Sequence, residues 1–248
     1  MVARTVLITG GSRGIGLAAV KLMLEDGAQV VSMQRKSTSE LETLKTQYAG
    51  ALRIVTGDCT MLQDITSAID ASLETYGSID TVVFNAAVNM PFGSIASLTL
   101  EGWQKMFDVN LFGVVRFVRE VLPVLRRSAL GGKIIFVSSA ACEAGIEGVG
   151  AYSASKAALN SLNRFALAVE EPMITCVSMH PGAVRTEMLK DLEAHGKGHV
   201  TSEAMNMIYD TLLEPEVSGR SLATLALRAP ASMTGKYLYW NDEQITAL

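Results

Sequence analysis

The sequence contains few cysteines and histidines. The three cysteines, Cys59, Cys142 and Cys176, are far apart and odd in number. They form neither a CxxC motif nor a disulfide framework, so we expect a reducing compartment. His195 and His199 have the spacing of a metal pair, but the Gly-Lys-Gly between them disfavours a helix. We therefore predict no bound metal.

The sequence also lacks an excess of positive charge and any long apolar run. Its formal net charge of −4 gives no basic footprint for nucleic acid. No apolar run has the length of a membrane span, and the N-terminal MVARTVLITGGSRG reaches glycine too early for a signal peptide. The 49% hydrophobic and 19% charged residues are typical of a globular chain. We therefore expect a cytoplasmic protein that binds neither nucleic acid nor a membrane.

Short β-branched runs alternate with longer helical stretches along the chain. The predicted strands are 5–9, 28–33, 52–58, 79–87, 131–139, 173–180 and 235–240, and a long helix is predicted over 103–125. Continuous apolar strands between helices indicate a parallel sheet with helices on both faces. We therefore predict an α/β fold with a doubly wound parallel sheet of about seven strands and a ligand site at their carboxyl ends.

We predict that residues 1–248 form one domain. An α/β domain of this length can bury a full core, and the sequence has no internal repeat or obvious linker. The segment 184–216 is the least strand-like part of the chain. We expect it to form helices inserted between the last two strands, over the site, as a substrate-binding lid.

The first motif is TGGSRGIG, from Thr9 to Gly16, directly after the first strand. Its glycines, Gly10, Gly14 and Gly16, allow a tight turn and let backbone N–H groups approach a pyrophosphate at a helix N-terminus. The pattern is TGxxxGxG rather than the GxGxxG of the standard dinucleotide fingerprint. The alternative is a glycine-rich turn that binds nothing, but its position between strand and helix favours nucleotide binding.

The second feature is the end of the second strand, which contains no acidic residue. A site that selects NAD places a carboxylate there to bind the ribose 2′-hydroxyl. This sequence instead has Gln34, Arg35 and Lys36, and Arg13 lies in the glycine-rich turn. The planar donors of a guanidinium match a phosphate. Although such charges are often only solvated, their position favours NADP(H).

The third feature is a serine, a tyrosine and a lysine that follow the fifth strand. Ser139 ends that strand, and Tyr152 and Lys156 are one helical turn apart in AYSASKAALN. A free phenol has a pKa of about 10, and a nearby ammonium group lowers it. Such a pair can exchange a proton with a substrate oxygen. A lone YxxxK is usually helix surface, but Ser139 and the glycine-rich turn favour catalysis here.

These motifs resemble the short-chain dehydrogenase/reductase family over almost the whole chain. The shared features are TGGSRGIG, Asp58, NAA at 85–87, Asn110, Ser139, YSASK at 152–156 and HPGAVRT at 180–186. Tyr152 follows Ser139 by thirteen residues, which is the spacing of that family and selects Ser139 over Ser138. The resemblance implies a Rossmann-type fold and hydride transfer with a nicotinamide cofactor.

The resemblance also implies catalytic roles for four residues. Tyr152 would be the acid in reduction or the base in oxidation, and Ser139 would orient the carbonyl. Lys156 would bind the nicotinamide ribose and lower the pKa of Tyr152. Asn110 would hold a water that links Lys156 to solvent.

The cofactor NADP(H) would be held by residues from several motifs. Asp58 would contact the adenine, and the backbone around 181–184 with Thr186 would hold the carboxamide. The expected cofactor-binding residues are Gly10, Ser12, Arg13, Gly14, Ile15, Gly16, Arg35, Asp58, Cys59, Asn85, Ala86, Tyr152, Lys156, Pro181, Val184 and Thr186. One departure from the family pattern is Ala87, where a glycine is usual.

The C-terminal GKYLYWNDEQ and the EEP at 170–172 resemble the fungal branch near benzil reductases and sepiapterin-reductase-like proteins. This similarity implies NADPH-dependent reduction of a small ketone or diketone, including aryl ones. Two alternatives are a catalytically silent NADP(H)-binding regulator and an enzyme that oxidises an alcohol. The resemblance also implies a homodimer or homotetramer, formed through the helices that contain Asn110 and Tyr152.

Overall fold

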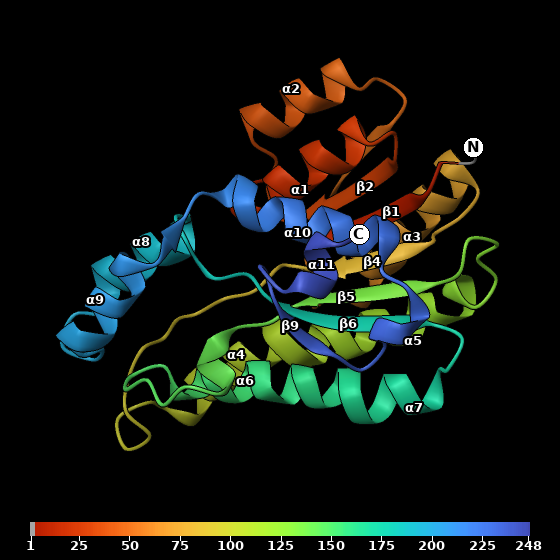
Figure 1. Cartoon of the computed structure of the whole chain (residues 1–248). Coiled ribbons are helices and arrows are strands. Elements are labelled where there is room, and N and C mark those ends of the chain that lie inside the picture. Colours follow the sequence, from red (N-terminus) through yellow and green to blue (C-terminus); the bar gives the residue numbers. More distant parts are fainter. Residues whose placement is uncertain (1–2) are drawn as a thin grey trace.

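A seven-stranded parallel sheet, in the order β3-β2-β1-β4-β5-β6-β9, forms the centre of the structure (Figure 1). The computed structural model describes residues 3–248. The strands of this sheet are β1 (Thr5–Thr9), β2 (Gln29–Gln34), β3 (Leu52–Thr56), β4 (Thr81–Phe84), β5 (Lys133–Val137), β6 (Thr175–His180) and β9 (Tyr237–Tyr239). All six neighbouring pairs are parallel. The predicted doubly wound fold and its seven strands are therefore confirmed.

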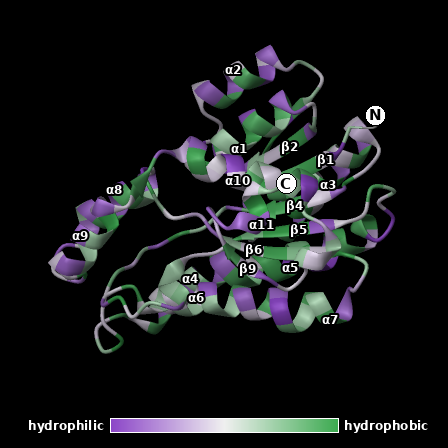
Figure 2. Cartoon of the chain, in the orientation of Figure 1, coloured by the Kyte–Doolittle hydropathy of each residue, from purple (hydrophilic) through white to green (hydrophobic). Residues whose placement is uncertain are grey.

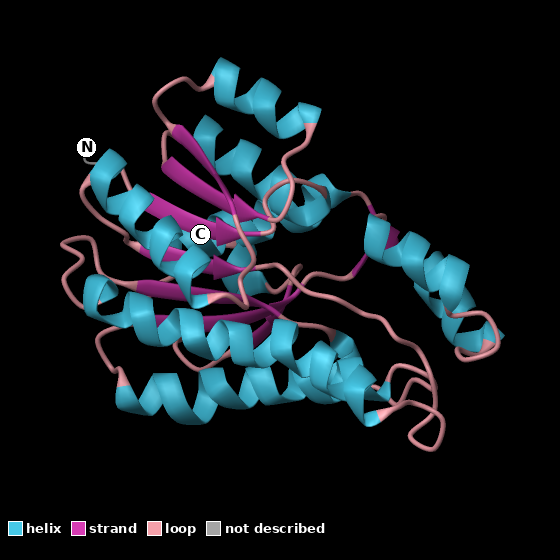
Figure 3. Ribbon diagram, turned by 180° about the vertical axis from the view of Figure 1, so that it is seen from behind, coloured by secondary structure: helices cyan, strands magenta, loops and turns pink. Residues whose placement is uncertain are grey.

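Helices cover both faces of the sheet, as Figures 1 and 3 show from opposite sides. The helices on one face are α1 (Gly14–Glu25), α2 (Ser39–Gln47), α10 (Pro215–Arg228) and α11 (Glu243–Thr246). Those on the other are α3 (Leu62–Tyr76), α5 (Gly113–Leu125) and α6 (Gly150–Ser161). Each layer encloses its own apolar cluster, so the strands are hydrophobic on both faces (Figure 2). This arrangement explains their continuous apolar sequences.

Two glycines fix how α1 is placed. Gly27, just after the helix, has a φ of +81°, which lets the chain turn directly into β2. Gly219 of α10 lies against α1, where an added Cβ would be 2.6 Å from the Cβ of Ala18. The two helices can therefore cross closely, and α1 is held with its N-terminus at the carboxyl edge of the sheet.

The long helix predicted over 103–125 is present but is interrupted by a π-helical turn. It consists of α4 (Leu100–Phe107), a π-helical turn η1 (Asp108–Phe112) and α5. The helix after β5 is similar, because α6 continues into the π-helical turn η3 (Leu162–Leu167) and α7 (Ala168–Glu170). Leu159 and Leu167 face the core, whereas Phe165 is 68% exposed. Short 3₁₀ turns are η2 (Ala140–Cys142) and η4 (Ala231–Met233).

The segment between β6 and β9 contains the expected inserted helices. Its elements before α10 are β7 (Ala183–Val184), α8 (Glu187–His195), α9 (Ser202–Asp210) and β8 (Leu212–Leu213). The short strands β7 and β8 pair and close the segment into a flap. Figure 1 shows α8 and α9 projecting outward from the sheet. No helix within residues 3–248 has the length and apolar character needed to cross a membrane.

Candidate active site

The glycine-rich turn joins β1 to α1 and is tied to the end of β4. The Asn85 amide donates to the carbonyls of Thr9 (3.1 Å) and Gly10 (2.9 Å). An added Cβ at Gly16 would be 2.2 Å from the Gly10 carbonyl oxygen, so only glycine fits. No side chain caps the N-terminus of α1. Its first N–H groups are therefore available to a phosphate, as the sequence predicts.

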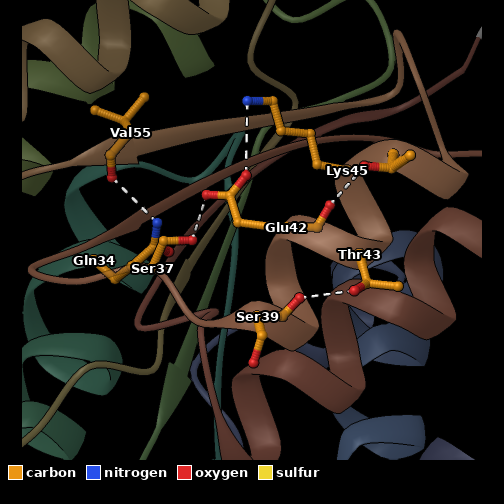
Figure 4. A network of polar contacts seen from close by, with 8 residues as sticks. Gln34, Ser37, Ser39, Glu42, Thr43, Lys45 and Val55 are labelled. Atoms are coloured by element: carbon orange, nitrogen blue, oxygen red, sulfur yellow. Dashed lines mark hydrogen bonds and ion pairs between the residues drawn. The ribbon is translucent and has the colours of Figure 1, made fainter.

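The end of β2 presents two cations, and they follow a glutamine, Gln34, whose side chain is fixed by hydrogen bonds (Gln34 is drawn in Figure 4). Gln34 is 6% exposed, accepts from the Ser32 hydroxyl (2.6 Å) and donates to the Val55 carbonyl (3.3 Å). Arg35 and Lys36 follow it and are exposed. Within residues 3–248, neither of them forms an ion pair. Both cations are therefore free to bind an anion at this edge.

The loop after β2 and the start of α2 are held by polar contacts of their own. Glu42 accepts from the Ser37 hydroxyl (2.7 Å) and pairs with Lys45 (3.9 Å) (Figure 4). The Thr38 hydroxyl donates to the Ser12 carbonyl (2.8 Å), which links this loop to the glycine-rich turn.

Asp58 and Cys59 lie next to Arg35 at the end of β3. Both the backbone and the hydroxyl of Thr60 donate to Asp58 Oδ1, each at 2.8 Å. Burial raises the pKa of the Cys59 thiol to about 11; the Asp58 carboxylate adds to this rise and Arg35 opposes it. Cys59 is thus a neutral thiol. The predicted adenine-side residues therefore lie together.

The segment after β6 returns to the glycine-rich turn, as the sequence predicts. An added Cβ at Gly14 would be 3.0 Å from Thr186 Cγ2. The Thr186 hydroxyl donates to the Val184 carbonyl (3.3 Å). Pro181 is buried at the start of this segment. Gly14 and Thr186, 172 positions apart, thus border one site, where backbone groups of the turn and of this segment could hold the two ends of a dinucleotide.

Ser139, Tyr152 and Lys156 lie at the end of β5 and on α6. Lys156 is 3% exposed, and its ammonium group donates to the Val137 carbonyl (2.8 Å). Its Nζ is 5.7 Å from the centre of the Tyr152 ring. Ser139 Oγ accepts from the Ala141 N–H (3.2 Å), so its own proton remains available for donation. The structure therefore brings the three predicted residues together.

The structure contradicts one expectation about the charge of Tyr152. Burial raises the pKa of Tyr152 to about 12, although a hydrogen bond from Ser139 opposes the rise. Burial also lowers the pKa of Lys156 to about 8. The pKa of Tyr152 is therefore shifted upward rather than downward as expected, because desolvation is the largest cause and Lys156 is not among the causes. The phenol is neutral at physiological pH.

Asn110 lies in the π-helical turn η1 and is 1% exposed. Its side chain accepts from the Val88 N–H (2.9 Å) and donates to the Val88 carbonyl (2.8 Å). It also donates to the Ser155 hydroxyl (3.0 Å), which in turn donates to the Tyr152 carbonyl (2.7 Å). Its side chain thus joins the loop after β4 to the catalytic helix and makes no direct hydrogen bond to Lys156.

Two site residues were not identified from the sequence. Asn89 is 8% exposed and donates to the Met188 carbonyl of α8 (2.8 Å), which ties the flap to the body. His180 ends β6, and its Nδ1 accepts from the N–H of Ala140, the residue after Ser139. No motif contains Asn89, and its partner is a backbone group 99 residues away. His180 could have been found only by its position before Pro181.

The chain is similar to several known oxidoreductases over nearly its whole length. A curated benzil reductase ((S)-benzoin forming) of Saccharomyces cerevisiae is 36% identical over 98% of this chain and 97% of its own length. An uncharacterized oxidoreductase of Schizosaccharomyces pombe is 34% identical, over 96% and 97%. Among solved structures, KRED1-Pglu has a TM-score of 0.88 and 38% identity, covering 95% of this chain and 100% of that one.

A second solved structure, a short-chain dehydrogenase/reductase from Saccharomyces cerevisiae, has a TM-score of 0.91 and 32% identity, covering 99% of each chain. These similarities confirm the predicted resemblance to the fungal benzil reductase branch. The model of the short chain dehydrogenase family matches residues 4–197. The chain therefore belongs to the short-chain dehydrogenase family of oxidoreductases, which use a nicotinamide cofactor.

Proposed function

We propose that the protein is an NADPH-dependent carbonyl reductase with Tyr152 as its proton donor. The observation that carries this proposal is the convergence of Ser139, Tyr152 and Lys156 at the carboxyl edge of the sheet, next to the glycine-rich turn. Its substrate would be a small ketone or diketone, including aryl ones, because a relative covering nearly the whole chain is named a benzil reductase.

The residues at this site fit nicotinamide adenine dinucleotide phosphate, NADP(H). The uncapped start of α1 offers N–H groups to the pyrophosphate, and Asp58 has one carboxylate oxygen for the adenine side. When bound, the cofactor supplies the hydride. Lys156 would bind its nicotinamide ribose, and the backbone of 181–184 with Thr186 would bind its carboxamide. The chain's own contribution is position and a proton.

The neutral Tyr152 fits the role of proton donor in a reduction. With a pKa raised to about 12, the phenol is protonated before the reaction and can donate its proton to a carbonyl oxygen. Oxidation of an alcohol would require the phenolate, which burial disfavours. The Ser139 hydroxyl, whose oxygen is held by the Ala141 N–H, would donate to the same carbonyl and orient it. The reaction is reversible in principle, so the substrate supply and the ratio of oxidised to reduced cofactor set its direction.

The preference for NADPH over NADH is proposed to depend on Arg35. Its guanidinium is exposed, lies beside Asp58 and Cys59, and has no anionic partner among residues 3–248. Arg35→Ala should lower the NADPH preference by about tenfold to a hundredfold, as expected when a charge-assisted phosphate contact is lost. Arg53→Ala, an exposed arginine on β3, is the matched control. An unchanged preference in Arg35→Ala would contradict this assignment.

The direct test is NADPH oxidation by the parent protein against aryl ketones, 1,2-diketones and aldehydes. Turnover that is strongest for a diketone would support the proposal and its substrate class. The second candidate is a catalytically silent NADP(H)-binding regulator on the same fold. Tight NADPH binding without turnover on the whole panel would favour it. Faster oxidation of the corresponding alcohols at equal cofactor concentrations would favour the oxidising alternative.

We also propose that residues 1–248 act as one domain in which 184–216 is the substrate lid. We propose a homodimer or homotetramer in the cytoplasm. The observation that supports assembly is that three large apolar side chains near the end of the helix that α7 completes and in the turn after it, Phe165, Val169 and Met173, are 68%, 70% and 85% exposed. Light scattering on the parent and on Phe165→Glu tests it, and a monomeric parent would contradict it. Cell fractionation tests the location.

A further inference from the structure

We propose that His180 is a positioning residue for Ser139, because its Nδ1 holds the N–H of Ala140 at 3.0 Å. This inference rests on the proposed function, in which the Ser139 hydroxyl orients the carbonyl. His180 lies on β6, and Ala140 is the first residue of the η2 turn after β5. The contact thus joins the ends of the neighbouring strands β5 and β6, at the residue that follows the candidate catalytic serine.

The hydrogen-bond ladder between β5 and β6 shows why this contact is needed. Ser138 N–H donates to the Met179 carbonyl (2.8 Å), which is the last rung. In a parallel ladder the donors alternate between the strands, so the next donor would be residue 181, which is proline and has no N–H. The rung after that would join the Ala140 N–H to the Pro181 carbonyl. That rung is absent, since the chain leaves the sheet at Ser139.

The two backbone groups that this rung would have joined are each hydrogen-bonded to a side chain instead. The Pro181 carbonyl accepts instead from the Ser218 hydroxyl of α10. The Ala140 N–H donates to the imidazole of His180, which stands where the next carbonyl would be. Without this acceptor the Ala140 N–H would lose its hydrogen-bond partner beside the site.

This contact controls the direction of the Ser139 hydroxyl. Ser139 has an extended backbone, and the plane of its peptide bond to Ala140 is set by where the Ala140 N–H points. The next N–H, of Ala141, donates to Ser139 Oγ (3.2 Å). Rotation of the Ser139–Ala140 peptide would therefore move both the backbone and the hydroxyl of Ser139.

The His180 ring is itself held in place. Tyr239 of β9 meets it edge-on, with ring centres 5.0 Å apart and an interplanar angle of 83°. The Tyr239 hydroxyl donates to Glu143 Oε2 (3.1 Å), which follows the η2 turn. Burial lowers the pKa of His180 to about 4, so the imidazole is neutral and Nδ1 has a lone pair at physiological pH. The acceptor is thus both fixed and unprotonated.

The test compares His180→Asn, His180→Gln and His180→Leu. Asparagine can place its oxygen near the position of Nδ1, glutamine places it one carbon further, and leucine has no acceptor. We expect kcat for the best carbonyl to fall about fivefold to tenfold in Leu and Gln, the equivalent of one hydrogen bond, and to recover in Asn. The dissociation constant for NADPH should stay unchanged. Thermal unfolding of each variant reports whether it is folded.

A double-mutant cycle with Ser139→Ala tests whether His180 acts through Ser139. In the Ser139→Ala background, His180→Gln should have no further effect on kcat. Equal kcat losses in both backgrounds, or an Asn variant as slow as Gln at similar thermal stability, would overturn the inference. Parental kcat in all three single variants would overturn it as well.

Amide hydrogen exchange of Ala140 separates this inference from the proposed function. Exchange should accelerate in His180→Gln and not in His180→Asn, whether or not the protein turns over a carbonyl. Unchanged exchange in His180→Gln would overturn the contact itself. A parent that lacks turnover, or a Ser139→Ala variant with parental kcat, would instead contradict the proposed function, while the exchange result would still decide the role of His180.

Discussion

The region around the glycine-rich turn and the flap of α8 and α9 border the same site but are held very differently. In the turn, Gly16 has no room for a methyl group, and Asn85 makes two hydrogen bonds to the turn's backbone. In the flap, Leu189 is the only buried residue of α8, and α9 has none. The first region is thus fixed by contacts to the core, whereas the second depends on a few links at its base and its tip.

The difference between the two regions suggests that the turn binds the cofactor and the flap admits the substrate. A cofactor common to a whole family requires one fixed backbone shape, which dense contacts provide. A flap with few buried contacts opens at low free-energy cost, as expected of a segment that admits substrates. Its links are the Asn89–Met188 hydrogen bond, the β7–β8 pairing and the close approach of Gly148 to the His199 carbonyl.

The largest effect is expected for Gly16→Ala in the fixed region. The added Cβ would lie 2.2 Å from the Gly10 carbonyl oxygen, so the turn must shift. We expect unfolding free energy to fall by about 1–3 kcal/mol and NADPH affinity to fall by about a hundredfold. Gly150→Ala, where nothing lies within 4 Å of the added Cβ, is the matched control. Parental NADPH affinity in Gly16→Ala would show that the turn is not fixed.

The next effect concerns His180 at the end of β6, whose ring meets Tyr239 edge-on. Its folded pKa of about 4 is below the ordinary 6.5, so the unfolded chain binds its proton first as the pH falls. His180 therefore contributes stability above pH 6.5 that is lost between 6.5 and 4. Across that window the parent should lose about 2 kcal/mol more than His180→Asn in urea unfolding. Equal losses would show that His180 is not buried as described.

A smaller effect is expected for Asn89→Ala, which removes the flap's hydrogen bond to the body. KM for the carbonyl should rise about fivefold, the value of one hydrogen bond, because the flap is less well placed over the substrate. The dissociation constant for NADPH should not change. Asn206→Ala, an exposed residue of α9, is the control. If Asn89→Ala weakens NADPH binding as much as carbonyl binding, the two regions are coupled rather than distinct.

The smallest effect is expected for the exposed ion pair between Arg185 and Glu214, whose side chains are 61% and 63% exposed. Arg185→Ala should change unfolding free energy by about 0.5 kcal/mol or less, since solvent screens such pairs. Chemical unfolding with and without salt is the measurement. A larger, salt-sensitive loss would mean that the flap is held by charge rather than by Asn89.

The sequence predicted the fixed region well because its residues follow local rules. Glycines between a strand and a helix, and apolar runs of strand length, have few structural solutions, so the parallel sheet and the turn could be expected. The grouping of Ser139, Tyr152 and Lys156 followed from strand and helix positions. Their neighbourhood was therefore predictable from spacing alone.

The remaining features depend on burial and on contacts between distant segments. The pKa of Tyr152 was expected to fall, but desolvation raises it. The spacing of residues along the sequence does not reveal how deeply a side chain is buried. Asn89 and His180 bind backbone groups of the flap and of the η2 turn, and no sequence pattern marks such partners. The outward placement of α8 and α9 is also not encoded in a local motif.

The most direct test of the account is single-turnover reduction of benzil by NADPH in the parent and in Tyr152→Phe. The account predicts that the phenol is the proton donor, so its loss should slow the reaction by about 10²- to 10⁴-fold while the dissociation constant for NADPH stays the same. A Tyr152→Phe variant that reduces benzil at the parental rate would contradict the central claim.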